Sequence, residues 1–356
     1  MAHKATPAPR SGREPGTAVP RGPMLREEFA AKRALPRGNL AALDLGTNNC
    51  RLLIARPEGD AFVIVDAFSR IVRLGEGLTA TGELSHAAIE RTISALSVCA
   101  DKLRKRRVVL ARSVATEACR QARNGKEFVA RVQRETGIML DIIPPREEAR
   151  LAVLGCQALL EPGDGPAMIF DIGGGSTELV LLDGDGDQLR IIDWLSAPHG
   201  VVSLAEVVAG HKEGPEGRAA AYAEMLRRMR EAFAGFAARL PKGVPVRLLG
   251  TSGTVTTLAS VHLGLPRYDR QAVDGLIVPA AAMRDISRRL STMSIEERMA
   301  LPCIGDERAD LVVAGCAILD SILDIWPADR LGVADRGIRE GILRALIDSA
   351  SSRKLG

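Results

Sequence analysis

Two glycine-containing turns, each preceded by an aspartate, carry the clearest chemistry in this sequence. The first reads Asp-Leu-Gly-Thr-Asn-Asn from Asp44, and the second reads Asp-Ile-Gly-Gly-Gly-Ser-Thr from Asp171. Glycine and other small residues let the backbone approach an anion, and successive N–H groups can surround it. We therefore predict phosphate binding by the turn residues Gly46, Thr47, Asn48, Gly173, Gly174, Gly175, Ser176 and Thr177.

The acids beside these turns indicate a metal ion. A carboxylate would repel a bare phosphate, so a cation between the two groups is the natural explanation. Mg²⁺ takes oxygen ligands and usually keeps several waters, so one or two carboxylates suffice to hold it. We predict Mg²⁺, or Mn²⁺ in its place, with Asp44, Asp171 and Glu178 as ligands.

The two turns belong to a longer internal repeat. Residues 44–53 and 171–180 align at an offset of 127 residues, and both read as Asp, apolar residue, Gly, small polar turn and hydrophobic strand. A period of this length is the size of a domain, which indicates two related domains facing each other across a cleft. We expect the first domain at 39–160 and the second at 161–336, with a final helix near 337–350 packing back on the first.

Strands and helices alternate along both halves, as is typical of α/β proteins. Helical spacing of apolar residues predicts a helix after Ser85, and Asn124 with Glu127 forms a capping-box pattern for another helix that Gly137 ends. Further strands are expected at 39–44, 51–56, 62–68, 108–111, 138–143, 167–171, 178–182, 189–194, 245–249 and 331–334, and further helices from 145 and at 202–209, 217–240, 280–291, 308–325 and 338–349.

The positive charge of the chain is concentrated at its N-terminus. The formal net charge is +4, but residues 1–38 hold eight Lys or Arg and three Glu, so the remainder carries −1. A near-neutral body does not favour a nucleic-acid partner, and the Pro-, Gly- and Arg-rich residues 1–38 predict a disordered basic tail. No apolar run is long enough for a transmembrane helix. Six scattered cysteines without a CxxC pair predict reduced thiols in a cytoplasmic protein.

Seven segments together resemble the exopolyphosphatase/guanosine pentaphosphate phosphatase (Ppx/GppA) family of the actin and sugar-kinase superfamily. They are 41–55 (AALDLGTNNCRLLIA), 115–122 (ATEACRQA), 147–151 (EEARL), 170–182 (FDIGGGSTELVLL), 248–259 (LLGTSGTVTTLA), 307–319 (ERADLVVAGCAIL) and 334–343 (ADRGIREGIL). The resemblance covers about residues 39–350, with the segments in the family's order. It implies an α/β fold of two actin-like, or ribonuclease H-like, domains facing a central cleft.

The resemblance also implies roles for residues outside the turns. The catalytic base of the family falls on Glu148, the second glutamate of EEARL. Helical periodicity alone does not choose between Glu147 and Glu148, because adjacent side chains point about 100° apart and apolar residues follow on both faces. Arg120 lies in the ATxxxR context of the family, where its guanidinium would clamp a phosphate.

The chain departs from the family pattern at two places. Ser252 stands where the third glycine turn usually has a glycine, and Pro144-Pro145 stands where many members have Ser-Gly. Proline is tolerated in the first turn of a helix, so we still expect the helix that carries Glu148. Longer members carry a C-terminal helical domain of the HD type, which we do not expect in a chain that ends at Gly356 without a His-Asp dipeptide.

The implied function is hydrolysis of the terminal phosphate of inorganic polyphosphate by a water that Glu148 activates for in-line attack. A guanosine penta- or tetraphosphate is the alternative ligand, with guanosine pentaphosphate as the alternative substrate. Phosphotransfer and non-catalytic alarmone sensing are alternatives from other classes. Aromatic residues make up only 3% of the chain, which offers little for stacking a base and favours polyphosphate. We expect no membrane partner, and a homodimer stays open.

Overall fold

The computed structural model describes Met1 and residues 38–352, except positions 60, 164, 185–188, 212–213 and 244–246. Residue contacts divide the chain into the segment Met1–Ala34 and a larger unit, Leu35–Gly356, and all described helices and strands lie in the larger unit. The predicted tail, residues 1–38, lies outside the described residues apart from Met1 and Gly38.

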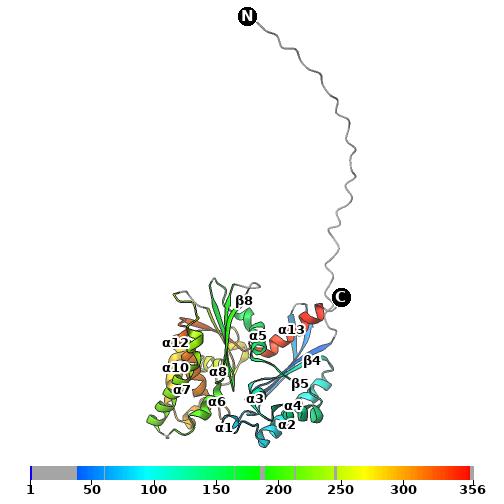
Figure 1. Ribbon diagram of the computed structural model, residues 1–356, viewed down its shortest axis with the longest axis horizontal. Helices are drawn as coiled ribbons and strands as arrows, with labels where there is room; N and C mark the ends of the chain where they lie inside the picture. The colour runs from blue at the N-terminus through cyan, green and yellow to red at the C-terminus, as the bar shows by residue number, and fades with distance from the viewer. Residues whose placement is uncertain are drawn as a thin grey trace. The chain divides into compact units, whose positions relative to one another are not determined.

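Sheet A comes from the first half of the chain (Figure 1). Its strand order is β3-β2-β1-β4-β5, with β1 antiparallel to β2 and parallel to β4, and β4 parallel to β5. The strands are β1 (Asn39–Leu45), β2 (Asn49–Glu58), β3 (Ala61–Ile71), β4 (Val108–Ala115) and β5 (Leu140–Ile142).

Sheet B repeats this topology in the second half. Its order is β10-β11-β9-β6-β7-β8, so the run β8-β7-β6-β9-β11 corresponds to β3-β2-β1-β4-β5 in order and direction. β10 is an additional edge strand, antiparallel to β11. The strands are β6 (Ala167–Ile172), β7 (Thr177–Asp183), β8 (Arg190–Ala197), β9 (Arg247–Thr251), β10 (Ile277–Pro279) and β11 (Arg330–Ala334).

The helices connect and cover these strands. They are α1 (Leu78–Thr81), α2 (His86–Lys105), α3 (Glu117–Gln121), α4 (Gly125–Thr136), α5 (Pro145–Cys156), a 3₁₀ turn (Gln157–Leu159), α6 (Val201–Val207), α7 (Pro215–Ala237), α8 (Gly253–His262), α9 (Arg270–Val273), α10 (Ala280–Thr292), α11 (Ile295–Met299), α12 (Val312–Ile325) and α13 (Ile338–Ser352). None of the described helices is long and apolar enough to cross a membrane.

Both faces of the central strand β1 are covered, because β1 is apolar at consecutive positions and successive side chains point to opposite faces. Ala41, Leu43 and Leu45 pack with α2 and α4 on the outer face. Leu40 and Ala42 point to the other face, where they pack with α5 and α13. This second face is the one directed toward sheet B, so we call it the inner face.

Sheet B is covered in the same way. Met168, Phe170 and Ile172 of β6 point outward into a core formed with α6, α7, α8, α10 and α12. Ala167 and Ile169 point inward and pack against α5. The row of α7, α10 and α12 along the outer side of sheet B is visible in Figure 1.

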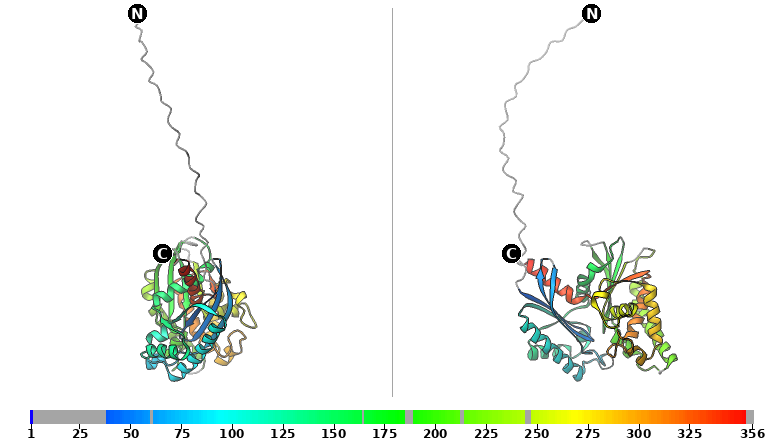
Figure 2. Two further views of the ribbon diagram at one scale, coloured as in Figure 1. Left: turned by 90° about the vertical axis from the view of Figure 1, so that its right-hand side faces the viewer. Right: turned by 180° about the vertical axis from the view of Figure 1, so that it is seen from behind.

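Helices α5 and α13 lie between the two sheets, and Figure 2 shows the red helix α13 against the blue strands of sheet A. Their backbones approach closely where they cross. A Cβ on Gly155 would collide with the carbonyl oxygen of Gly337, and one on Gly341 would collide with that of Leu151. Glycine is therefore required at both crossing positions for this packing.

The predicted fold class is confirmed, and most predicted elements are present within a few residues. The capping box of α4 is wrong, however. Asn124 makes no side-chain cap and instead accepts a hydrogen bond from the backbone N–H of Leu84 and donates one to its carbonyl oxygen. Gly137 does end α4, in a left-handed conformation with φ 75°. The short helices α1, α3, α9 and α11, helix α8 and the strand β10 were not anticipated.

Candidate active site

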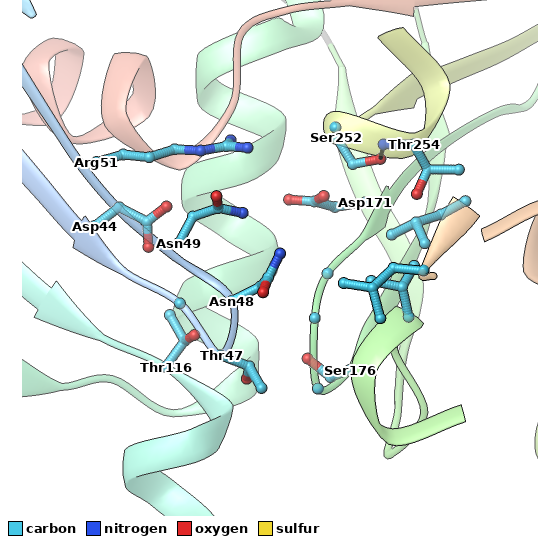
Figure 3. Close-up of a pocket in the computed structure, with 18 of the residues that line it drawn as sticks. Asp44, Thr47, Asn48, Asn49, Arg51, Thr116, Asp171, Ser176, Ser252 and Thr254 are labelled. Carbon is cyan, nitrogen blue, oxygen red and sulfur yellow. Dashed lines mark hydrogen bonds between the residues drawn. The ribbon is translucent and has the colours of Figure 1, made fainter. Parts of the chain in front are cut away.

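A pocket lies where the β1–β2 turn faces the β6–β7 turn (Figure 3). Figure 3 shows Asp44 and Arg51 projecting from the side of sheet A and Asp171 and Ser176 from the side of sheet B. Most of the residues predicted from the sequence line it together. They are Asp44, Gly46, Thr47, Asn48, Glu148, Asp171, Gly173, Gly174, Gly175, Ser176 and Glu178.

The alternation of each strand explains why the acids of the hairpins point into the pocket. Asp44 continues the inner-face row of Leu40 and Ala42 on β1. Asp171 likewise continues the row of Ala167 and Ile169 on β6. Because side chains repeat every second residue, the end of each inner row is an aspartate aimed between the sheets.

The two turns have the same backbone geometry. The N–H of Gly46 donates to the carbonyl of Asn49 at 2.9 Å, and the N–H of Gly173 donates to the carbonyl of Ser176 at 3.0 Å. Within the described part of the chain, the intervening amides of Thr47, Asn48, Gly174 and Gly175 have no hydrogen-bond partner. These N–H groups are therefore available to an anion in the pocket.

The glycines of the second turn allow the two turns to touch. A Cβ on Gly174 would lie 3.0 Å from the backbone nitrogen of Asn48, and one on Gly175 would lie 2.6 Å from Oγ1 of Thr47. Larger residues would push the hairpins apart and widen the space between their amides. The Gly-Gly-Gly sequence is thus a packing requirement of this pocket.

Glu147 and Glu148 at the start of α5 have different surroundings. Glu148 is buried and lines the pocket, whereas Glu147 pairs with Arg112 at 2.9 Å and Arg150 at 2.7 Å outside it. Pro145 occupies the first helical turn, and the carbonyl of Pro144 accepts the N–H groups of both glutamates. The helix expected despite the two prolines is present.

Arg120 and Thr177 do not line the pocket. The guanidinium of Arg120 is bonded to Glu117, to the carbonyl of Ile143 at 2.7 Å and to Oε2 of Glu148 at 3.1 Å. The hydroxyl of Thr177 donates to the carbonyl of His199 at 2.7 Å. Arg120 therefore orients Glu148 here, and the Thr177 side chain joins β7 to the segment before α6.

Burial raises the pKa values of the pocket carboxylates. Desolvation raises the pKa of Asp171 to about 6, and desolvation together with the charge of Asp171 raises the pKa of Glu178 to about 7. Burial also raises the pKa of Asp44, although Arg51 opposes the shift. Burial and the nearby Glu178 hold the pKa of Glu148 well above its usual range. Four acids around one pocket raise the free-energy cost of ionising all of them, and a cation bound nearby would lower that cost.

The donor set is compatible with Mg²⁺. Oδ1 of Asp44 is buried and has no hydrogen-bond partner among the described residues. Carboxylate oxygens are the ligands that Mg²⁺ prefers. In the described part of the chain, no group of three or more His, Cys, Asp or Glu side chains is close enough together to hold a metal ion by itself. The residues therefore fit an ion held by one or two carboxylates and completed by water and substrate oxygens.

Two arginines in the pocket were missed by the sequence analysis. Arg51 lies opposite Asp44 in the β1–β2 register, and Arg308 donates to Oγ1 of Thr257 on α8 at 2.7 Å. Arg51 could have been found, because it has the same strand parity as the inner-facing Leu53. Arg308 lies outside helices and strands, so no alternation of side chains could indicate where it points. Other lining residues are Asn49, Ile71, Thr116, Ile172, Val201, Ser252, Gly253, Thr254, Leu311, Val312 and Ile338.

Two sheets of identical core topology with a glycine-turn pocket between them define an actin-like α/β protein. The sequence matches the Ppx/GppA phosphatase family over residues 53–350. The chain therefore belongs to the Ppx/GppA phosphatase family, as its motifs predicted, and is an enzyme of the phosphohydrolase class.

Named relatives agree with this assignment. The chain is 32% identical over 321 residues to Exopolyphosphatase 2 of Mycobacterium tuberculosis, covering 86% of this chain and 98% of that protein. The crystal structure of an Aquifex aeolicus Ppx/GppA family member is similar with a TM-score of 0.71 and 30% identity, covering 88% of this chain and 98% of that one. An exopolyphosphatase structure from Cytophaga hutchinsonii, at 24% identity, shares the fold with a TM-score of 0.77 over 87% of this chain and 98% of that one.

Proposed function

We propose that this protein is an exopolyphosphatase that removes the terminal phosphate from inorganic polyphosphate. The observation that carries this proposal is the convergence of two unpartnered amide turns, two arginines and four carboxylates, of which those of Glu148 and Glu178 are buried, on one pocket. Similarity to Exopolyphosphatase 2 of M. tuberculosis supports the same activity.

Binding begins with the terminal phosphate between the turns. The amides of Thr47 and Asn48 donate to it from one side, and those of Gly174 and Gly175 from the other. Arg51 and Arg308 neutralise the phosphates that follow along the chain, since a guanidinium can fork onto two phosphate oxygens. Positioning and charge neutralisation of this kind supply most of the catalysis in phosphoryl transfer.

Glu148 is the general base in this proposal. It takes a proton from water, the water oxygen forms a bond to the terminal phosphorus, and the bond from that phosphorus to the bridging oxygen breaks in line. The electron pair of the broken bond leaves with the shortened chain. A carboxylate whose pKa is raised by burial is a stronger proton acceptor once it is ionised. Arg120, bonded to Glu148 at 3.1 Å, holds it in position.

Mg²⁺ is the proposed cofactor. Asp44, Asp171 and Glu178 are its candidate protein ligands, of which one or two would bind the ion directly while water and substrate oxygens complete its coordination. When bound, the ion neutralises negative charge on the phosphate oxygens. Asp171 and Glu178 are opposite each other in the β6–β7 register, so both can face one ion. Mn²⁺ prefers the same oxygen donors and is expected to substitute.

Polyphosphate is the preferred substrate and guanosine pentaphosphate the alternative. Both present a terminal phosphate on an anionic chain. None of the described residues that line the pocket is aromatic, so a guanine base would find no ring on which to stack. The wall beyond the turns offers Arg308 and the first turn of α8 instead, which suit further phosphates.

The test is phosphate release from the two substrates side by side, at equal concentrations of terminal phosphate and with Mg²⁺ present. We expect kcat/KM for polyphosphate to exceed that for guanosine pentaphosphate by about tenfold or more, the scale of discrimination that a few pocket contacts provide. Glu148→Gln prepared in parallel controls for contaminating phosphatases. A preference for guanosine pentaphosphate, or no release above this control, would contradict the proposal.

A further inference from the structure

The segment between β3 and α1, residues 72–77, braces the first turn, and we call it the bracing loop. Val72 and Arg73 donate their N–H groups to the carbonyl of Asn48 at 2.9 and 3.0 Å, and Gly75 donates to the carbonyl of Thr47 at 2.9 Å. These bonds hold the turn by its carbonyl oxygens and leave the amides of Thr47 and Asn48 without a partner among the described residues. Any movement of the bracing loop therefore moves the amides that face the pocket.

The second turn is braced by α6. Its first residues, Val201 and Val202, donate to the carbonyls of Gly173 and Gly174 at 3.0 and 2.8 Å. At the other end of the helix, Oε1 of Glu206 accepts the N–H of Gly77 in the bracing loop at 2.7 Å. The supports of the two turns are thus bonded to each other, although they belong to different sheets.

An ion pair makes a second connection between the two halves. Nη1 of Arg73 lies 2.8 Å from Oδ2 of Asp310, and the two side chains are 34% and 33% exposed. Asp310 directly precedes Leu311 and follows Arg308 by two residues, and both of these line the pocket. One residue of the bracing loop, Arg73, therefore contacts the first turn through its backbone and, through its side chain, the residue that lies next to Leu311 in the opposite wall of the pocket.

The backbone of Arg73 is held in an unusual conformation for this purpose. Its φ is 47°, in the left-handed region that residues other than glycine rarely occupy. Such a conformation persists only where the surroundings require it, and it often marks functional sites. In this conformation the Arg73 N–H reaches Asn48 while the side chain reaches Asp310.

We propose that the Arg73–Asp310 ion pair is a latch that holds the halves built on sheets A and B closed over the substrate, and that Arg73 is a positioning residue. Its kinetic consequence rests on the polyphosphatase function proposed above. Breaking the latch lowers the fraction of molecules in the closed, binding-competent form. Apparent affinity falls by that same fraction, while the chemistry inside a closed molecule is unchanged.

The latch is broken with Arg73→Asn, because asparagine tolerates a left-handed backbone and so leaves the loop conformation in place. The matched control is Glu76→Gln in the same loop, which removes an ion pair with Arg91, at 2.7 Å, that stays within the sheet-A half. The rescue variant reverses the pair as Arg73→Asp with Asp310→Arg.

Spin-label distances test the closure without any turnover. Labels are placed at Lys126→Cys on α4 and Arg289→Cys on α10, with Cys303, the one cysteine that is not buried, changed to serine. We expect Arg73→Asn to add a population at longer distance in the absence of substrate, and Glu76→Gln and the reversed pair to match the wild type. Identical distributions for Arg73→Asn and the wild type would overturn the latch.

The kinetic arm measures polyphosphate hydrolysis by the same variants without labels. Arg73→Asn is expected to raise KM about 5- to 10-fold and to change kcat by less than about twofold, with recovery in the reversed pair. A fall in kcat at unchanged KM, or no recovery, would overturn the positioning role. If no variant hydrolyses polyphosphate, the proposed function fails, whereas the distance measurement still decides whether the latch exists.

Discussion

The two hairpins that face each other across the pocket share the hydrogen bond that closes each turn, and they carry opposite charges at one matched strand position. In the first, Asp44 lies opposite Arg51, and in the second, Asp171 lies opposite Glu178. The first hairpin therefore presents a pair of opposite charges and the second presents two like charges. In the function proposed above, Arg51 of the first hairpin contacts a phosphate, whereas Asp171 and Glu178 of the second can face a cation.

The supports of the hairpins differ as well. The first turn is held by the bracing loop, which also contacts the other half of the protein through Arg73. The second turn is held by the N-terminal end of α6. A loop shifts more easily than a packed helix, so in the proposed latch the first turn is the one whose position would respond to opening.

Replacing Arg51 of the first hairpin by the glutamate found at the matched position of the second should have the largest effect on activity. Arg51→Glu removes a proposed phosphate contact and adds a fifth acid to the pocket. We expect kcat/KM for polyphosphate to fall by roughly 10³-fold or more, since loss of one charge-stabilising group alone costs about 10²–10³. Arg51→Lys keeps the charge and should retain much more activity. Equal losses in both variants, at unchanged melting temperature, would show that charge at this position is unimportant.

The like charges of the second hairpin should cost stability above neutral pH. The pKa of Glu178 is raised to about 7, so the folded state favours its protonated form, and that contribution is lost as pH rises from about 4.5 through 7. In EDTA, Glu178→Gln should therefore increase the free energy of unfolding by up to about 3 kcal/mol at pH 8 and by little at pH 4.5. Glutamine can still accept the hydrogen bond from Ser196. Urea unfolding at the two pH values measures this, and an equal change at both would contradict the assignment.

The Mg²⁺ requirement of the enzyme should depend more on the acids of the second hairpin than on the acid of the first. Asp171→Asn and Glu178→Gln are expected to raise the Mg²⁺ concentration for half-maximal activity about 10- to 100-fold. Asp44→Asn should raise it less, because Arg51 already opposes the charge of Asp44. Titration of activity with Mg²⁺ compares the three variants. Undiminished turnover in excess EDTA would refute the metal site altogether.

Glycine substitutions in the bracing loop and at the start of α6 compare the supports of the two turns, and we expect their effects on stability to be the smallest of the series. A Cβ on Gly200 would collide with backbone atoms of Gly173 and Gly174, whereas the atom that one on Gly75 would collide with is the side-chain methyl group of Thr47. Gly200→Ala should therefore destabilise the protein by about 1–2 kcal/mol and Gly75→Ala by less, because a side chain yields more easily than backbone. Thermal melting measures the stability of both variants. A larger loss of stability for Gly75→Ala than for Gly200→Ala would contradict this order.

Local patterns predicted much of this molecule. The turns at Asp44 and Asp171 could be identified because glycine, small residues and flanking strands are contiguous in the chain. Their approach in space followed from the repeat, since two copies of one fold can face each other across a cleft. The choice of Glu148 came from family resemblance, because helical periodicity treats it and Glu147 alike.

The side-chain contacts that could not be predicted are those in which a residue bonds to a partner that its local sequence pattern does not indicate. Asn124 fits a capping-box pattern, yet its side chain bonds to Leu84, which is 40 residues away in sequence. The phosphate contact of Arg120 stays a prediction, whereas its ion pairs with Glu117 and Glu148 had no signal in the sequence. The Arg73–Asp310 pair joins residues 237 positions apart and has no local signature.

The most direct test of the pocket as a hydrolytic site compares Glu148→Gln with Glu147→Gln. The two residues are adjacent on α5, but only Glu148 is buried and lines the pocket. With saturating polyphosphate and Mg²⁺, Glu148→Gln should lower kcat by about 10²–10⁴ and leave polyphosphate binding largely intact, because a general base acts on the transition state. Glu147→Gln should stay close to wild type. The reverse pattern, with the loss at Glu147 and full turnover in Glu148→Gln, would contradict a hydrolytic site between the two hairpins.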